Sequence, residues 1–370
     1  MKKFFTKCSA AILSAAMCMS MAACGNAGEA ATTEAATTEA ATETATEAAT
    51  EKDTEAATEA SATEAEKTDG EVHDITLVLD WTPNTNHTGF YVALEKGYFE
   101  DENLNVSIVQ PPEDGATMMV ASGQAQFGID FQDYLAPVFS SEDDYNVTAV
   151  AALIQHNTSG IISLKEDGID SFKNLEGKNY ATWELPVEQA MIRYCMEAEG
   201  GDYSKLNLIP EYVTDEAAAL QQDIDAIWVY YAWGGIATER AGLDTNMIYF
   251  SDIVPEFDYY SPVIVANTEF LEQDPEVAKA FLRATAKGYE DAIANPDEAA
   301  EILCKQVPEL DLDMVKESQE WLADKYKAEV EQWGYIDQAR WDAFYKWLSD
   351  NGLSDEIPAG YGFTNEYLPQ

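Results

Sequence analysis

Basic residues are scarce in this chain. It has 21 Lys and Arg against 68 Asp and Glu, so its formal net charge is −47. Proteins that bind nucleic acid need Lys and Arg to replace the counterions of the phosphates, so this balance argues against DNA or RNA as a partner. The length of 370 residues allows about two domains. We therefore expect the ligand to be a small molecule.

Cysteine and histidine are also few, with five and three copies. Only Cys195 and Cys304 fall in the part of the chain expected to fold. Each lies in a helical pattern, which is more typical of buried apolar side chains than of a disulfide or a metal site. His73, His87 and His156 are scattered, and no paired-cysteine motif is present. The sequence therefore predicts no metal site.

The apolar run near the N-terminus is short for a membrane span. Three lysines precede Ala10 to Ala23, as in a signal peptide. The small residues before Cys24 resemble the lipobox of bacterial lipoproteins. This resemblance implies cleavage after residue 23, a lipid on the Cys24 sulfur and an anchor on the extracytoplasmic face of the cell membrane. An ordinary signal peptide cut near Ala23, or a membrane anchor, is the alternative.

Residues 24–71 contain a tract of Ala, Thr and Glu between Asn26 and Gly70. This tract has no aromatic or large aliphatic side chains. It has nothing to bury against the entropy of ordering, so we predict a disordered, self-repelling spacer. Because Ala and Glu favour helix, a transient helix is the competing interpretation. In both cases the tract would hold the folded part away from a membrane.

From Val72 onward, apolar strand patterns alternate with helical patterns. This alternation is typical of βαβ crossovers on mostly parallel sheets, and it occurs in two sets, so we predict an α/β fold with two lobes. Strands are expected at 75–79, 105–109, 127–129, 147–153, 179–182, 206–209, 226–229 and 247–249. Helices are expected at 87–96, 115–122, 133–139, 186–198, 215–222 and 235–241.

The lobes are predicted to be discontinuous in sequence. Ile161 to Leu164 and Pro262 to Ala266 suit two hinge strands that carry the chain out to a second lobe and back. Lobe one would comprise residues 72–160 and 265–370, and lobe two residues 161–264, with the ligand cleft between them. Helices at 275–294, 296–306, 312–326 and 336–349 would pack on lobe one and across the back of both lobes.

One stretch combines a strand end, a polar turn and a helix start. The apolar run from Ile75 ends at Asp80 and Trp81, and a Thr, Pro and Asn turn leads into the helix expected from His87. Open α/β sheets present ligand-contacting groups at the carboxyl ends of their strands. We interpret this stretch as the first wall of a small-molecule site.

Four segments would line the cleft, namely 80–91, 128–135, 181–192 and 226–234, and none contains Lys or Arg. They offer aromatic rings and carboxylates, which suit a flat, neutral or protonated, amine-bearing heterocycle such as an aminopyrimidine better than an anion. The candidate ligand-binding residues are Trp81, Asn84, His87, Tyr91, Asp130, Phe131, Trp183, Glu184, Glu188, Trp228, Tyr230 and Tyr231.

Several of these residues have a structural alternative. Glu188 lies two positions after Pro186 and could cap a helix start instead of contacting a ligand. His87 and Asn84 could bond to the local backbone and shape the turn. Strand alternation lets only some of the aromatic residues from Trp228 to Tyr231 face the cleft. Trp81 could belong to a core, although its position at a strand end favours a stacking role.

The run DWTPNTNHTGFYVALEKGYFEDENLNVSIV, followed in order by PVEQAMI, DAIWVYYAWGG and YYSPVIVAN, resembles the NMT1/THI5-like family. The resemblance covers roughly 75–287. It implies a type II periplasmic binding protein fold. Within the family the chain is most similar to lipoproteins of ABC transporters that bind thiamine pyrimidine precursors such as formylaminopyrimidine. Other relatives bind sulfonates, nitrate or other small molecules.

The same family contains thiamine pyrimidine synthases, which use iron, pyridoxal phosphate and their own histidine. In that branch, the segment after the third strand carries a Schiff-base lysine and the sacrificed histidine. The matching stretch here, Gly128 to Leu135, has neither, and the cysteine-rich iron motif is missing. We therefore expect a binder without cofactors. A secreted enzyme of the synthase type stays an alternative, as do receptors for sulfonate, nitrate or riboflavin.

The resemblance also implies a mechanism. A ligand that contacts both lobes favours the closed form. The closed form would dock on a membrane permease served by an ATPase, and the lipid on Cys24 would keep the receptor close to that permease. We expect the receptor to be a monomer.

Overall fold

The computed structural model describes residues 70–113, 115–143 and 145–369. The predicted signal peptide, Cys24 and nearly all of the Ala/Thr/Glu tract lie outside these residues.

The first sheet has the strand order β2-β1-β3-β10-β4. Its strands are β1 (His73–Val78), β2 (Leu104–Val109), β3 (Phe127–Asp130), β4 (Val147–Ala152) and β10 (Val263–Asn267). Strand β1 pairs in parallel with β2 and β3, whereas β10 is antiparallel to both β3 and β4. Strand β10 therefore joins the sheet from far along the chain.

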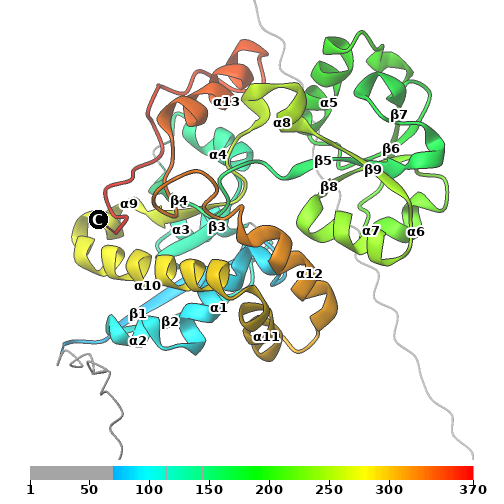
Figure 1. The fold of residues 1–370 in the computed structure, drawn as a ribbon. Helices are drawn as coiled ribbons and strands as arrows, with labels where there is room; N and C mark the ends of the chain where they lie inside the picture. The colour runs from blue at the N-terminus through cyan, green and yellow to red at the C-terminus, as the bar shows by residue number, and fades with distance from the viewer. Residues whose placement is uncertain (1–69, 114, 144, 370) are drawn as a thin grey trace, which may run out of the picture. The chain divides into compact units, whose positions relative to one another are not determined.

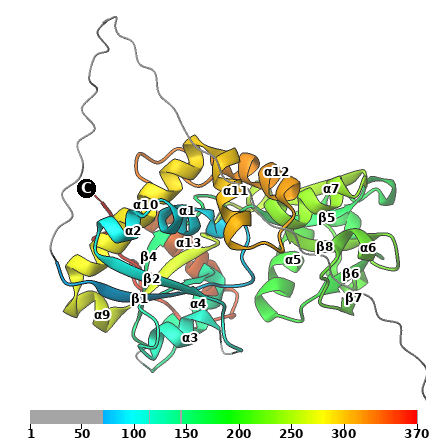
Figure 2. The ribbon, with the colours of Figure 1, turned by 90° about the horizontal axis from the view of Figure 1, so that it is seen from below.

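Helices cover both faces of this sheet. They are η1 (Thr85–His87), α1 (Thr88–Glu95), α2 (Tyr98–Asp101), α3 (Ala116–Ala121) and α4 (Gln132–Phe139). Figure 2 shows α1 and α10 next to each other on one face, and α3 and α4 on the other. Alternation along β1 explains both layers. Ile75 and Leu77 pack in a cluster with Phe90 of α1, and Val78 packs in another cluster with Leu135 of α4.

The second sheet has the order β7-β6-β8-β5-β9. Its strands are β5 (Ser159–Leu164), β6 (Asn179–Thr182), β7 (Asn207–Pro210), β8 (Ala226–Tyr230) and β9 (Thr245–Tyr249). Its helices are α5 (Pro186–Ala198), α6 (Glu216–Leu220), α7 (Ile236–Arg240) and α8 (Phe250–Ile253), with short turns η2 (Lys165–Asp167), η3 (Phe172–Leu175), η4 (Tyr203–Lys205), η5 (Tyr231–Gly235) and η6 (Pro255–Phe257). Strand β6 is parallel to β7 and β8, and β5 is antiparallel to β8 and β9.

The two sheets have the same design, and they confirm the predicted α/β class with two sheets. In each sheet the fourth strand is the antiparallel one, β10 in the first and β5 in the second. These are the strands expected at the hinges. Each lies wholly within one sheet, so the chain passes between the sheets in residues 153–158 and 254–262 (Figure 1).

The C-terminal part is helical and touches both sheets' helices. It contains α9 (Thr268–Gln273), α10 (Pro275–Ala294), α11 (Pro296–Gln306), α12 (Leu312–Ala323) and α13 (Gln338–Asp350). Ser318 of α12 donates a hydrogen bond to the carbonyl of Ala232 in η5, at 2.5 Å. Trp347 of α13 packs edge-on against Tyr194 of α5, with ring centroids 5.6 Å apart. Helices α12 and α13 therefore contact the elements that surround the second sheet.

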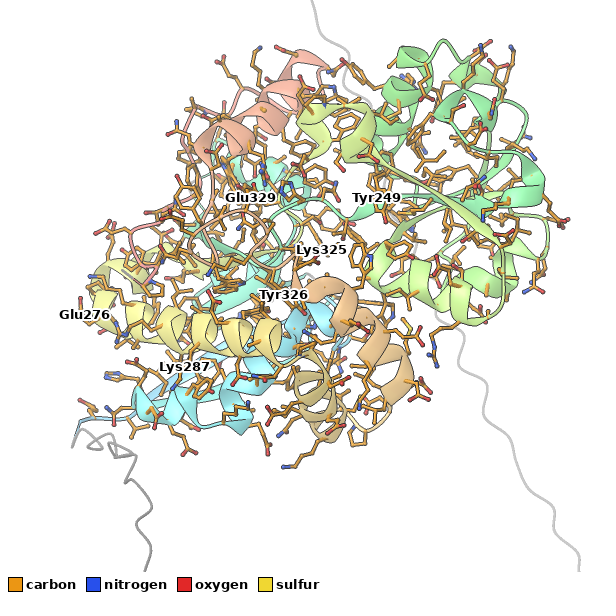
Figure 3. The ribbon with its side chains drawn as sticks, viewed as in Figure 1. Tyr249, Glu276, Lys287, Lys325, Tyr326 and Glu329 are labelled. Atoms are coloured by element: carbon orange, nitrogen blue, oxygen red, sulfur yellow. The ribbon has the colours of Figure 1, made fainter. Side chains whose placement is uncertain are left out.

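The aromatic core under the first sheet is centred on α10. The ring of Phe281 stacks on Phe127 of β3 at a centroid distance of 3.9 Å and on Phe99 of α2 at 5.4 Å. At the other end of α10, the rings of Tyr289 and Tyr326 lie 5.2 Å apart, and Figure 3 labels Tyr326. Helix α10 thus spans the sheet from its edge to the segment that follows α12.

Candidate functional site

The carboxyl ends of β1, β3, β6 and β8 carry the predicted site residues. The segment after β1 is held by its own hydrogen bonds. The Nε2 atom of His87 lies 2.6 Å from Oδ1 of Asp80, and its Nδ1 atom accepts the backbone N–H of Asn84 at 3.2 Å. Because Nδ1 is an acceptor, Nε2 carries the proton that Asp80 accepts. The side chain of Asn84 accepts the N–H of Asn86, which caps η1.

His87 and Asn84 therefore shape the turn, and both are buried. Tyr91 is also buried, in a cluster formed with α11 and α12. Trp81 differs from them, because 43% of its surface is exposed. Of the four predicted residues in this segment, Trp81 has the most exposed side chain.

The segment after β3 combines carboxylates with aromatic rings. Asp130 is buried and accepts hydrogen bonds from the Thr117 hydroxyl and from the N–H of Phe131 at 2.8 Å. Burial raises the pKa of Asp130 to about 6, against the lowering effect of these two donors. The ring of Phe131 lies 5.5 Å from that of Tyr134, in an edge-on arrangement.

Phe131 also contacts the second sheet. Its ring stacks on that of Tyr230, the last residue of β8, with centroids 5.8 Å apart and planes 20° apart. The Tyr230 hydroxyl lies 3.0 Å from the hydroxyl of Ser261, which precedes β10. Phe131 and Tyr230 therefore bring the carboxyl ends of β3 and β8 together.

The segment after β6 is organised around Glu188. Both oxygens of its carboxylate are occupied at the start of α5, and the side chain is 3% exposed. The donors are the hydroxyls of Tyr180 and Thr182 and the backbone N–H groups of Trp183 and Leu185, at 2.7 to 3.1 Å. With four donors, this carboxylate caps the start of α5, which is the alternative role that the sequence analysis gave for Glu188.

The remaining predicted residues divide by exposure. Trp228 is 5% exposed and packs on Phe250 at 4.0 Å and on Trp183 at 5.6 Å, so it lies in the core. Tyr231 donates a hydrogen bond to Glu239 at 2.8 Å. Glu184 is exposed and has a positive φ of 62°.

Two residues that the site prediction did not include lie beside Phe131. Tyr134 is 50% exposed. The Oδ1 atom of Asp133 is buried without a hydrogen-bond partner, and burial, helped by the charge of Asp130, raises the pKa of Asp133 to about 7. Both residues follow β3 within a segment that was already expected to line the cleft. Their position just after a strand end is the feature of the sequence that could have identified them.

The candidate site is therefore an edge that carries the rings of Phe131, Tyr134 and Tyr230 and, in the same segment after β3, the carboxylates of Asp130 and Asp133. Among the described residues, no Lys or Arg forms an ion pair with either of these two carboxylates. Two surface hollows, of about 780 and 450 Å³, lie elsewhere and include none of the predicted site residues.

The described residues contain no group of three His, Cys, Asp or Glu side chains that could hold a metal ion. Cys195 and Cys304 are both free thiols. No helix in the described ranges is long and apolar enough to cross a bilayer.

This architecture defines the class of protein. The alkanesulfonate-binding protein SsuA from Xanthomonas axonopodis pv. citri superposes with a TM-score of 0.59 over 80% of this chain and 99% of its own, at 10% sequence identity. The fold is that of the type II periplasmic binding proteins, as expected from the sequence.

The chain belongs to the NMT1/THI5-like family, whose match covers residues 84–299. It is 30% identical to the formylaminopyrimidine-binding protein of Halalkalibacterium halodurans over 296 residues, which are 77% of this chain and 88% of that protein. It is also 26% identical to the 4-amino-5-hydroxymethyl-2-methylpyrimidine phosphate synthase of Legionella pneumophila, over 64% of this chain and 74% of the synthase. Binders and enzymes are therefore both among its relatives.

Proposed function

We propose that this protein is the solute receptor of an ABC importer and captures an aminopyrimidine precursor of thiamine between its two lobes. The observation that carries this proposal is the stacked pair of Phe131 and Tyr230, one from each sheet, beside carboxylates that no Lys or Arg neutralises. The relative that is 30% identical is named for binding formylaminopyrimidine, which is such a compound.

The chemistry of this edge favours an amine-bearing ring over an anion. A flat heterocycle can insert between or stack on aromatic rings. Its amino group or protonated ring nitrogen donates to a carboxylate. A sulfonate or nitrate would instead meet the carboxylates of Asp80, Asp130 and Asp133. After burial, the charge of Asp80 raises the pKa of Asp130, and the charge of Asp130 raises the pKa of Asp133. Burial and then the charges of Asp133 and Asp80 also raise the pKa of Tyr230.

Capture would proceed by hinge closure around the residues that link the sheets. A solute that contacts Phe131 and Tyr230 together binds better to the closed form, so it shifts the population toward closure. The closed receptor would then deliver the solute to a permease and its ATPase. A lipid on Cys24 and the acidic tract would keep the receptor at the outer face of the membrane, which raises its effective concentration near the permease.

A thermal-shift screen of the full chain tests this function. The probes are formylaminopyrimidine, hydroxymethylpyrimidine, thiamine, riboflavin, taurine and nitrate. A ligand at about a hundred times its dissociation constant adds roughly 2.7 kcal/mol to the free energy of unfolding. We expect a shift with the pyrimidines, and a shift with taurine or nitrate alone would contradict the aminopyrimidine assignment.

The enzyme alternative follows from the synthase relatives. It requires a lysine for pyridoxal phosphate, and the segment from Gly128 to Leu135 has none. We propose that the chain is not an enzyme. Pyridoxal phosphate absorbance that persists after dialysis, together with bound iron, would favour the synthase instead.

A further inference from the structure

Within the described part of the chain, one oxygen of the Asp133 carboxylate lacks a hydrogen-bond partner, although the backbone N–H groups of Asp133 and Tyr134 act on this carboxylate and lower its pKa against the effect of burial. Asp133 is the second residue of α4, directly after Phe131 and Gln132. Its Oδ1 atom is buried and has no partner among the described residues. Asp130 beside it accepts from Thr117 and from a backbone N–H, and Asp80 accepts from His87. The two neighbouring carboxylates are therefore satisfied by the protein, whereas one oxygen of Asp133 is not.

The charge of Asp133 acts on tyrosine hydroxyls of several elements. After burial, the charge of Asp133 is the largest cause that raises the pKa of Tyr134 on α4, of Tyr230 on β8, of Tyr259 before β10 and of Tyr345 on α13. Tyr230 belongs to the second sheet, so the charge of Asp133 acts on a residue of the opposite sheet.

A buried carboxylate oxygen that has no donor destabilises a protein. Such a group is retained when a ligand supplies the missing partner. The aromatic surroundings fit a flat ring, and an acceptor that needs a hydrogen selects a ligand with N–H groups. An anionic ligand would instead add a second negative charge to this position.

We infer that Asp133 accepts a hydrogen bond from the amino group or protonated ring nitrogen of the bound solute and thereby selects amine-bearing heterocycles over anions. This inference rests on the proposed function and adds the residue that sets its specificity. Phe131 and Tyr230 would hold the ring, and Asp133 would fix which of its edges faces the first sheet.

The test replaces the carboxylate by its neutral isostere in the full chain. Asp133→Asn is compared with Asp297→Asn, because Asp297 is also the second residue of a helix but is exposed on α11. Calorimetry with 4-amino-5-hydroxymethyl-2-methylpyrimidine at pH 8 should show affinity weakened about 10- to 100-fold by Asp133→Asn, as for a lost hydrogen bond to a charged group. Asp297→Asn should bind as the parent does. Affinity within twofold of the parent in Asp133→Asn would overturn the inference.

A second readout separates this inference from the proposed function. In the absence of ligand at pH 8, Asp133→Asn should melt at a higher temperature than the parent, because it removes a charge whose Oδ1 atom is buried without a donor. Should the parent bind no pyrimidine, the proposed function fails and this inference fails with it, whereas a parent that binds a pyrimidine while Asp133→Asn binds it equally well contradicts this inference alone. An unchanged or lower melting temperature would show that the protein itself satisfies this carboxylate, and would overturn the inference.

Discussion

At the level of single residues, exposure divides the aromatic side chains into two groups. Trp81 and Tyr134 keep about half of their surface exposed at the carboxyl ends of strands, whereas Trp228 is almost fully buried. A ring that is exposed at a strand end costs little stability and can stack on a solute. A ring that packs in the core cannot also stack on a solute.

Trp81→Ala and Trp183→Ala test the aromatic walls. Each should weaken heterocycle binding about 3- to 10-fold, because an aromatic stacking contact is lost. For Trp81, the free energy of unfolding should change by less than about 0.5 kcal/mol, as expected at an exposed position. Fluorescence titration and urea unfolding measure the two effects, with the exposed Tyr335→Ala as control. If both tryptophan variants bound the heterocycle with the affinity of the parent, Trp81 and Trp183 would not belong to the binding site.

At the level of elements, the two segments that link the sheets are joined by a charged cluster. The Nδ1 atom of His156 lies 2.7 Å from Asp258, and its Nε2 atom lies 2.8 Å from Glu329 in the segment after α12 (Figure 3). Asp258 also accepts the N–H of Asn157 at 3.0 Å, and Arg340 lies 3.7 Å from it. The hydrogen bond to Asp258 is the main cause that raises the pKa of His156, and Glu329 adds to it.

This cluster predicts a pH dependence. A raised histidine pKa stabilises the fold below the unfolded value of about 6.5, and the contribution is lost as pH rises through the folded pKa. His156→Gln should therefore lower the melting temperature at pH 5.5 and have little effect at pH 9. Because His156 is 42% exposed, the effect should stay within about 1 kcal/mol. Melting curves of both proteins across this range measure it, and a variant effect that is equal at both pH values would contradict the charged pair.

The contact between α1 and α10 depends on glycine. A Cβ atom on Gly288 would lie 2.1 Å from the carbonyl oxygen of Gly89. Such a distance is impossible without moving one helix, although alanine is normally the better helix former. The two helices therefore approach as closely as their backbones allow.

Gly288→Ala should destabilise the protein by roughly 1–3 kcal/mol, as overpacking does in a core. Lys279→Ala on an exposed face of the same helix is the control, with an expected change below about 0.5 kcal/mol. Urea unfolding measures both variants. If Gly288→Ala had a higher free energy of unfolding than the parent, the two helices would be able to move apart without losing stability.

At the level of the whole molecule, the proposed anchor decides where the receptor works. Cys24→Ala should release the protein from the membrane fraction into the surrounding fluid, because no lipid can then be attached. Fractionation followed by immunoblotting measures this, with Cys18→Ala as the matched control within the predicted signal peptide. Retention of Cys24→Ala on the membrane would indicate an uncleaved anchor or a binding partner.

Local sequence determined most of the elements. Helices α5, α10 and α11 begin and end at the predicted residues, because each starts with a proline that suits the first helical position and continues with a regular apolar face. Short helices such as α2, α8 and α9 were not predicted, since a turn of four to six residues has too little periodicity to detect. The family was also evident from the sequence, through the motif after β1.

Only the tertiary structure decided which polar groups are still free to bind a solute. Glu188, His87 and Asn84 are all occupied by hydrogen bonds within the protein, whereas Asp133, which the site prediction omitted, keeps an oxygen without a partner. The sequence places a carboxylate near a strand end through the periodicity of its neighbours. Whether that carboxylate is satisfied depends on donors that arrive from distant segments, and those meet it only when both sheets have folded.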